Sequence, residues 1–266
     1  MRALFGWNEA WYRGRYPDVA AACDQGGFAD ALRHFLTFGL REGRYPSAVA
    51  ESNPIRYDAL RRRKFMVGET PVPLDWPITG EPANTFVAKL VNGFFAKYLA
   101  GEMILDIGYK GTDPAAVPIL PHAVGVDLDY PGYDGLHLPM AAETVDAVFA
   151  SHVLEHILDY RTVIADWHRV LRLGGYIVCA VPHQFLYEKK RELPSRWNRL
   201  HHRFYTPARL LREFEESLPP NSYRVRLLCD NDLGYLYGIP PEHHAAGSYE
   251  IELVVEKIEP PAWTVD

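Results

Sequence analysis

Cysteine is scarce in this sequence: three of the 266 residues are cysteine, and they lie far apart at Cys23, Cys179 and Cys229. No CxxC pair occurs, so neither a disulfide framework nor a cysteine zinc site is indicated. Disulfides belong to oxidising compartments, and their absence here makes the reducing cytoplasm the expected location.

Long apolar runs are also missing, since no stretch approaches the roughly 18 residues that indicate a membrane helix. The apolar stretch within Met1–Glu9 is too short for a secretory signal and is followed by polar residues. The net charge of −6 argues against a nucleic-acid partner. We therefore expect no membrane span and no nucleic acid, whereas the oligomeric state stays open.

Apolar spacing and proline content divide the chain into three predicted parts. Residues 1–47 read as a small helical module, with helices near 7–16 and 28–40. Residues 48–83 are rich in proline, which predicts a linker or arm with at most one short helix near 57–65. Residues 84–266 form the third part.

This third part alternates short apolar runs with amphipathic helices, which predicts an α/β domain with a parallel sheet covered on both faces. Strands are expected at 103–108, 123–127, 145–150, 176–182, 223–228 and 249–258, and helices at 84–98, 159–172 and 206–218. Gly174-Gly175 is expected to end the second helix, and Thr206 to cap the third, which starts at Pro207. Ligands of such sheets bind at the carboxyl ends of the strands.

Five stretches in order resemble a class I S-adenosylmethionine (SAM)-dependent methyltransferase of the small-molecule or sugar type, over residues 100–258. They are Ile104-Leu-Asp-Ile-Gly108, Val124-Gly-Val-Asp127, Asp134 ahead of Leu138-Pro-Met140, Val145 to His156, and Arg169 to Gly175 with the strand that follows. The resemblance implies a Rossmann-like, mostly parallel sheet with an antiparallel last strand, and SAM as the cofactor.

The resemblance also implies where the cofactor binds. A glycine turn at Gly108 lets the backbone approach the methionine portion, with Gly111 adding backbone freedom and Asp106 orienting the loop. Asp127 would accept the ribose hydroxyls, as carboxylates do in dinucleotide sites. Further implied contacts are Asp134 to the adenine amino group, the backbone of Leu136, and Ser151 on the cofactor side.

The glycine loop departs from the family pattern, because Lys110 and Thr112 replace its second and third glycines. Pro114, Pro118 and Pro121 leave room for only one or two helical turns after the loop. Lys110 also brings a cation near the expected sulfonium unless it points away or pairs with a carboxylate. An alternative is therefore a catalytically inactive methyltransferase-like binding or scaffold protein.

Methyl transfer to a hydroxyl needs alignment of the acceptor and a base. Histidine titrates near neutrality, so His152, His156 and His183, at or just beyond strand ends, are the candidate bases. Residues 183–206 form an insert rich in arginine and aromatic residues, which suits a polar, ring-shaped or anionic ligand. The substrate-binding candidates within it are Tyr187, Arg196, His201, Arg203 and Tyr205.

A metal is not expected from the sequence. His201, His202, Glu242, His243 and His244 are the ligand types that could cluster. Adjacent histidines usually point apart, however, and the HExxH spacing of zinc enzymes is absent.

The end of the insert, His201 to Pro207, resembles segments of methyltransferases from sugar and surface-polysaccharide pathways. Residues 11–20 and 34–44 resemble a small helical module found beside glycan-modifying proteins. The prediction is therefore an enzyme that methylates a small molecule or glycan, in polysaccharide biosynthesis. A nucleotide-binding enzyme of other chemistry is a weaker alternative, because the GxGxxG fingerprint is missing.

Overall fold

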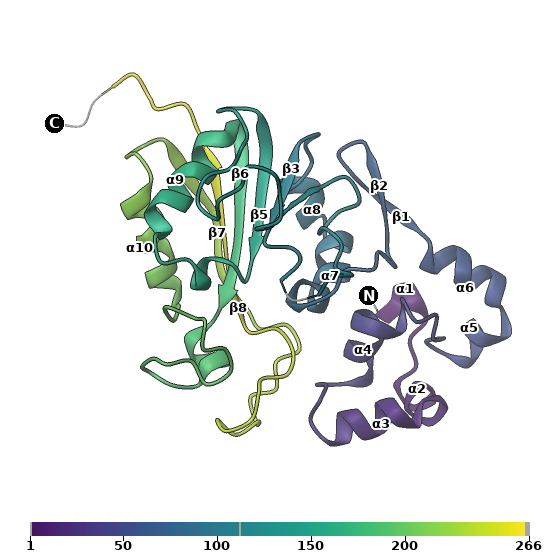
Figure 1. The fold of residues 1–266 in the computed structure, drawn as a ribbon. Helices are drawn as coiled ribbons and strands as arrows, with labels where there is room; N and C mark the ends of the chain where they lie inside the picture. The colour runs from purple at the N-terminus through teal and green to yellow at the C-terminus, as the bar shows by residue number, and fades with distance from the viewer. Residues whose placement is uncertain (1, 112, 264–266) are drawn as a thin grey trace. The chain divides into compact units, whose positions relative to one another are not determined.

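The computed structural model describes residues 2–111 and 113–263, which form two compact units (Figure 1). Unit 1 combines Met1–Ala96 with Asp232–Tyr249, and unit 2 combines Lys97–Asn231 with Glu250–Asp266. The three-part division expected from sequence differs from these units, because residues 48–83 belong to unit 1 and the chain returns to it at residues 232–249. Thr112, one of the loop departures, lies outside the described residues.

Unit 2 is built on a six-stranded sheet with the order β4-β3-β5-β6-β8-β7. Its strands are β3 (Ile104–Ile107), β4 (Val124–Val126), β5 (Val145–Ser151), β6 (Leu171–Pro182), β7 (Tyr223–Asn231) and β8 (Glu250–Lys257). The β4, β3, β5 and β6 strands pair in parallel, and β8 runs antiparallel to both β6 and β7. The predicted fold class and all six predicted strands are confirmed.

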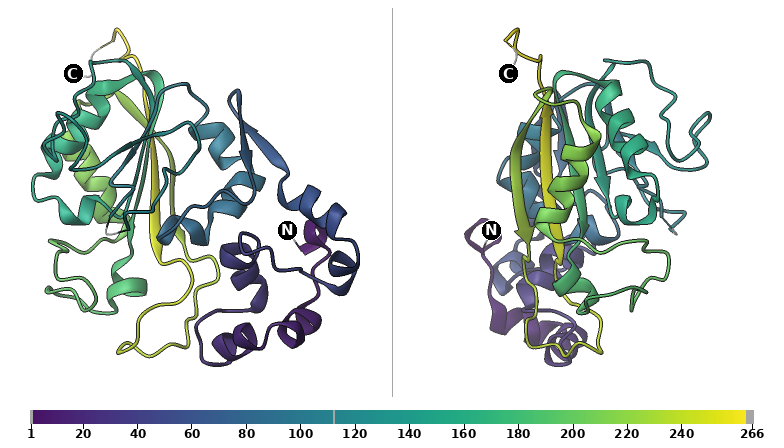
Figure 2. Two further views of the ribbon diagram at one scale, coloured as in Figure 1. Left: turned by 45° about the vertical axis from the view of Figure 1, so that its right-hand side comes forward. Right: turned by 90° about the vertical axis from the view of Figure 1, so that its left-hand side faces the viewer.

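Two helices, α9 (Tyr160–Val170) and α10 (Pro207–Ser217), pack on one face of this sheet, seen edge-on at the right of Figure 2. Trp167, Leu210 and Phe214 are fully buried in the core between helices and sheet. Thr206 caps α10 by accepting a hydrogen bond from the N–H of Arg209, as predicted. Short helical turns η3 (Leu154–His156) and η4 (Gln184–Glu188) follow β5 and β6.

The expected end of α9 at Gly174-Gly175 is wrong. The helix stops at Val170 and β6 begins at Leu171, which has extended dihedrals and pairs with Val145 of β5. Both glycines therefore lie inside β6. A Cβ on Gly175 would come within 2.8 Å of the Asp146 carbonyl oxygen, so close strand packing explains that glycine.

Unit 1 is mainly helical. Its elements are α1 (Arg2–Phe5), α2 (Glu9–Arg15), α3 (Pro17–Asp24), α4 (Ala31–His34), η1 (Phe35–Gly39), α5 (Ala48–Ser52), α6 (Pro54–Arg61), β1 (Lys64–Val67), β2 (Thr70–Pro73), η2 (Glu81–Asn84) and α7 (Phe86–Val91), while α8 (Phe94–Tyr98) crosses into unit 2. Helical structure near 7–16 and 28–40 is confirmed by α2 and by α4 with η1.

The expectation of at most one short helix in 48–83 is wrong, because this segment holds α5, α6, η2 and the β1–β2 hairpin. Proline accounts for part of the error. Pro54 starts α6 at a position where its missing N–H costs nothing, and Pro71 and Pro73 lie in a two-stranded sheet whose outer edges need no donor. The helix predicted for 84–98 is split into α7 and α8 around Gly93, which has φ +84°.

No helix in the described ranges 2–111 and 113–263 is both long and apolar enough to cross a membrane.

Candidate functional site

The loop after β3 begins at Gly108, and only glycine suits this position. Its φ is +69°, and a Cβ here would lie 2.5 Å from Cγ2 of Val153. Ser151 is one residue beyond the Ile107–Ala150 pair in the β3–β5 register, so Gly108 and Ser151 meet at the carboxyl edge of the sheet. The predicted glycine turn and the predicted cofactor-side serine are thus neighbours.

Asp106 is buried beneath this loop and accepts a hydrogen bond of 2.5 Å from the N–H of Ile119. Burial raises its pKa to about 8, and the charge of Asp127 acts in the same direction, against the hydrogen bond. The bond ties the connection between β3 and β4 to the sheet. Asp106 therefore holds the segment that leads into β4, and its role in orienting the glycine loop stays a prediction.

Asp127 follows β4 and is half-buried. One carboxylate oxygen accepts the N–H of Leu128 at 2.7 Å, and the other accepts the N–H of Lys110 at 3.3 Å. A carboxylate oxygen has two lone pairs, so each oxygen keeps one for a further donor. Asp127 thus fits the pair of ribose hydroxyls that SAM presents.

The cation of Lys110 has a partner. Its Nζ donates to Oδ2 of Asp129 at 2.6 Å, and this hydrogen bond raises the pKa of Lys110 and lowers that of Asp129. The described residues from Gly108 to Ala123 form turns rather than a helix. The lysine is therefore compatible with a bound sulfonium, because its charge is compensated.

The side chain of Ser151 is a second feature that fits a bound cofactor. Its Oγ is buried and has no hydrogen-bond partner among residues 2–111 and 113–263. Burying a hydroxyl without a partner costs about 1–3 kcal/mol. A polar ligand group at this edge, such as the amino acid end of SAM, would satisfy it.

Asp134 lies differently from its predicted role. It is exposed, and its carboxylate accepts the N–H groups of Leu136 at 2.8 Å and His137 at 2.6 Å, with the His137 ring at 2.9 Å. These bonds lower the pKa of Asp134. Asp134 and the Leu136 N–H therefore stabilise a turn, and their assignment to adenine stays a prediction.

His152 is the first residue past β5 and adopts φ +57°, a conformation that is uncommon for a residue with a side chain. Its Nε2 lies 3.2 Å from Oε1 of Glu250, and its Nδ1 lies 3.7 Å from Oε1 of Glu155. The buried Glu250 in turn accepts a hydrogen bond from Asn231. His152 is thus held between two buried carboxylates at the carboxyl edge of the sheet.

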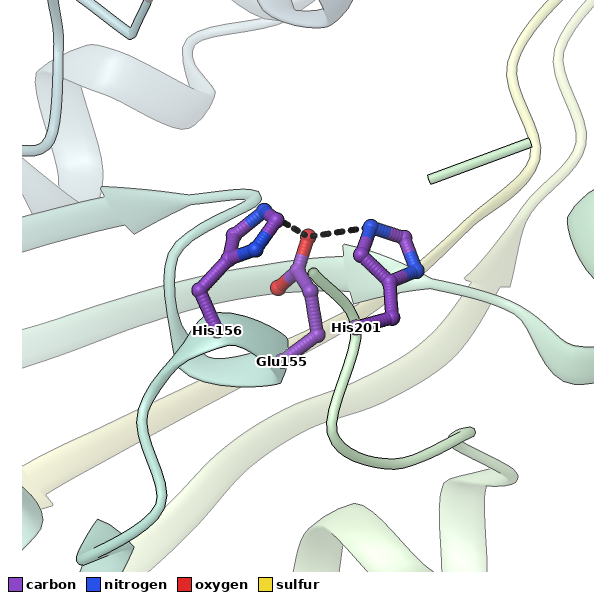
Figure 3. A group of neighbouring side chains, drawn as sticks. All are labelled: Glu155, His156 and His201. Atoms are coloured by element: carbon purple, nitrogen blue, oxygen red, sulfur yellow. Dashed lines mark ion pairs between the residues drawn. The ribbon is translucent and has the colours of Figure 1, made fainter. Parts of the chain in front are cut away.

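A cluster of three side chains lies next to His152: Glu155, His156 and His201 (Figure 3). Nε2 of each histidine lies 3.9 Å from Oε1 of Glu155. Nδ1 of His201 bonds Glu188 at 2.9 Å, and Nδ1 of His156 lies 3.2 Å from the carbonyl oxygen of Leu200. Burial, followed by the charge of His201, lowers the pKa of His156.

His183 caps η4. Its Nδ1 accepts the N–H groups of Phe185 at 3.0 Å and Leu186 at 3.3 Å, and burial lowers its pKa. The neutral ring therefore carries its proton on Nε2, and the only lone pair on nitrogen is already used. This geometry favours a structural role over the predicted role as a base.

Two of the predicted substrate-binding residues are core residues instead. Tyr205 is fully buried, and its hydroxyl accepts from Nε of Arg203 at 2.8 Å and donates to Glu213 at 2.7 Å. Arg203 is buried too, and it donates to the carbonyl oxygens of Leu154 and Ile157. Both residues tie the insert to η3 and α10, so direct substrate contact is not supported for either.

Tyr187 belongs to the insert and is buried, and its carbonyl oxygen accepts a hydrogen bond from the Trp197 indole at 2.9 Å. Arg196 is exposed on the same segment. His201 belongs to the Glu155 cluster described above. Of the five predicted substrate contacts, Arg196 is the one whose side chain stands open to a ligand.

Sequence reasoning missed Glu155, Glu188 and Glu250 as site residues. Glu155 lies in the stretch Val145 to His156, which carries the resemblance but gives no sign that this side chain is fully buried. Glu188 binds Ser195, the N–H of Arg196 and His201. Burial alone would raise the pKa of Glu188, but the hydrogen bonds from His201, Ser195 and the Arg196 N–H outweigh it and lower the pKa. Local sequence could not reveal these long-range contacts.

The sheet order, the glycine turn after β3 and the carboxylate after β4 together define a Rossmann-like methyltransferase fold. Residues 92–179 match the family model described as "Methyltransferase domain". A Mycolicibacterium smegmatis protein named "Probable S-adenosylmethionine-dependent methyltransferase" is 26% identical over 194 residues, which cover 63% of this chain and 71% of that protein.

Solved structures are more distant. A SAM-dependent methyltransferase from Archaeoglobus fulgidus is 14% identical, with a TM-score of 0.42 over 64% of this chain and 92% of that one. A chain solved in work on the conversion of a disulfide bond into a thioacetal group during echinomycin biosynthesis is 17% identical, with a TM-score of 0.43 over 77% and 92%.

Residues 92–179 are thus similar to a methyltransferase domain, and the SAM-dependent relative makes SAM the cofactor. The match favours the enzyme over the non-catalytic alternative.

Proposed function

We propose that this enzyme transfers the methyl group of SAM to a hydroxyl of a small polar molecule, specifically a sugar or surface-polysaccharide intermediate. The observation that carries the proposal is the insert, residues 183–206, which leaves β6 at the carboxyl edge of the sheet. Its resemblance to segments of sugar-pathway methyltransferases and that of the amino-terminal module to glycan-associated modules support the same class of acceptor.

A cavity of about 260 Å³ lies between the insert and the start of α10. Its lining includes the guanidinium groups of Arg191 and Arg209 against one acid, Glu192, together with His202, while Arg203 in its wall is already bonded to the core. Guanidinium groups recognise phosphates, carboxylates and sugar hydroxyls through paired hydrogen bonds. The cavity therefore suits an anionic or polyhydroxylated acceptor better than an apolar one.

SAM supplies the electrophilic methyl group when bound. Asp127 holds the ribose, and Ser151 meets the polar amino acid end. His152 is the base in this proposal: a proton taken from the acceptor hydroxyl places a positive charge between Glu155 and Glu250, which stabilise it. His183 is not assigned this role, because its acceptor nitrogen caps η4.

The test is a radiolabel transfer assay with methyl-labelled SAM against a panel of free sugars, nucleotide sugars and short polysaccharide fragments. We expect label in one of these groups, and an Arg191→Ala/Arg209→Ala variant should raise the KM for that acceptor with unchanged SAM affinity. Transfer only to apolar or protein acceptors would refute the proposed substrate class. His152→Gln should lower kcat with little change in either affinity.

A further inference from the structure

We propose that Glu155, His156 and His201 bind a divalent transition-metal ion of the zinc type at the carboxyl edge of the sheet. The three ligand atoms all lie within 4.8 Å of one another, and Figure 3 shows both imidazoles turned toward the same carboxylate. The sequence alone indicated no metal. The three residues differ from the adjacent histidine pairs considered in the sequence analysis. Glu155 and His156 are neighbours in η3, and His201 comes from the insert.

The hydrogen bonds around the cluster set which nitrogen of each ring faces inward. Glu188 accepts from Nδ1 of His201, and the Leu200 carbonyl oxygen accepts from Nδ1 of His156. The proton of each neutral ring is therefore on the outer nitrogen, and Nε2 presents its lone pair to Glu155. Histidines that ligate metals are oriented in this way by an outer carboxylate or carbonyl group.

The distances inside the cluster fit an ion better than a proton. Both Nε2–Oε1 separations are 3.9 Å, which is longer than a hydrogen bond. Zinc bonds of about 2.0–2.2 Å in tetrahedral geometry place neighbouring ligand atoms roughly 3.3–3.6 Å apart. The two nitrogen–oxygen separations would contract by a few tenths of an ångström around a metal, and the two imidazole nitrogens, which lie within 4.8 Å of each other, would also have to move closer together.

The donor set has a chemical meaning. Two imidazoles and one carboxylate are typical of catalytic zinc, which keeps a position for an oxygen ligand. The side chain of His156 is 33% exposed, so the ion has a route from solvent, whereas Glu155 is fully buried. His152 lies 3.7 Å from the same Glu155 oxygen. A metal here would bind an acceptor oxygen or water next to the proposed base, and would fasten the insert to the end of β5.

The experiment uses the full chain, free of any affinity tag and stripped of metal with a chelator. Bound zinc is counted by mass spectrometry after equilibrium dialysis, and the affinity is measured by competition with a chromogenic chelator. The visible spectrum of the Co²⁺ form reports the coordination geometry. All measurements are made without SAM, so their outcome is independent of the proposed acceptor.

We expect one zinc per chain and a Co²⁺ spectrum of four- or five-coordinate type. Loss of a residue that only hydrogen-bonds a metal ligand weakens metal binding about 10–100-fold. Loss of a ligand itself should weaken it more, so we expect His156→Ala and His201→Ala each to weaken zinc binding by at least about 100-fold. His202→Ala is the matched control, because His202 is exposed and lies outside the cluster. It should bind zinc like the wild type.

His156→Ala is the deciding variant, because its ring is partly exposed and the fold should survive the change; circular dichroism checks this. The proposal is overturned if the wild type binds less than one equivalent of zinc. It is also overturned if His156→Ala and His202→Ala have the same zinc affinity, since exposed histidines would then account for the binding.

Discussion

Replacing Asp127 by Asn should reduce the affinity for SAM by about 100-fold. Each carboxylate oxygen already accepts one backbone N–H, from Leu128 or Lys110, and keeps one lone pair for a ribose hydroxyl. Hydrogen bonds to charged groups contribute about 1.5–3 kcal/mol each. The asparagine amide keeps one acceptor oxygen but turns a donor toward the second hydroxyl, so the net loss is roughly 3 kcal/mol, a factor of about 100 in Kd.

The assay is calorimetric titration with SAM and with S-adenosylhomocysteine. Glu102→Gln is the control, because it removes the same charge from an exposed carboxylate that precedes β3, at the opposite end of that strand from the cofactor loop. We expect a change of less than about threefold for the control, because this carboxylate is exposed and lies away from the expected ribose. Equal losses in the two variants, or an unchanged Kd for Asp127→Asn, would refute the placement of the ribose.

Three further predictions concern the residues around the site. Gly108→Ala should lower the free energy of unfolding in urea by about 1–3 kcal/mol, because φ is +69° and the new Cβ meets Val153 at 2.5 Å; unchanged stability would mean that the loop rearranges freely. Tyr205→Phe should lower the free energy of unfolding by about 1–3 kcal/mol with an unchanged acceptor KM, because Oε2 of the buried Glu213 loses the hydroxyl that donates to it. A raised KM at unchanged stability would restore the role of Tyr205 as a substrate contact. The pKa of Asp106 is raised from 3.8 to about 8, so the native state holds this proton more tightly than the unfolded state does. Asp106 therefore stabilises the fold at low pH, and this contribution is lost as the pH rises from about 4 to about 8. Asp106→Asn should remove this decline from melting curves recorded across pH 5 to 8, and parallel curves for the two proteins would contradict it.

The strands of unit 2 could be predicted because their signal is local. A run such as Ile104–Ile107 is apolar throughout except for Asp106, and a turn residue follows it directly. The same holds for the N-terminus of α10, where Thr206 and Pro207 carry both the cap and the first turn. The prediction failed where a local signal conflicted with a long-range contact. Gly174-Gly175 resembles a helix stop, but the pairing of Leu171 with Val145 starts strand β6 before these glycines.

The glycine loop shows the same division. Its departures from the family pattern are visible in the sequence, and they raised the question of whether Lys110 opposes a bound sulfonium. The contact with Asp129 answers that question, and it depends on two loops that follow different strands. A single sequence cannot reveal that pairing.

What the sequence by itself determined is the order of strands and helices along the chain and the methyltransferase class, because each follows from local periodicity and short motifs. The edge of the sheet where the cofactor binds stays a prediction. The tertiary structure alone decided which charged residues are buried together. Glu155 and His201 are separated by 45 intervening residues, yet burial in the same small volume gives Glu155 three imidazole neighbours and removes Arg203 and Tyr205 from solvent. Burial and charge pairing are properties of packed elements, and they arise only when the insert folds back onto the sheet.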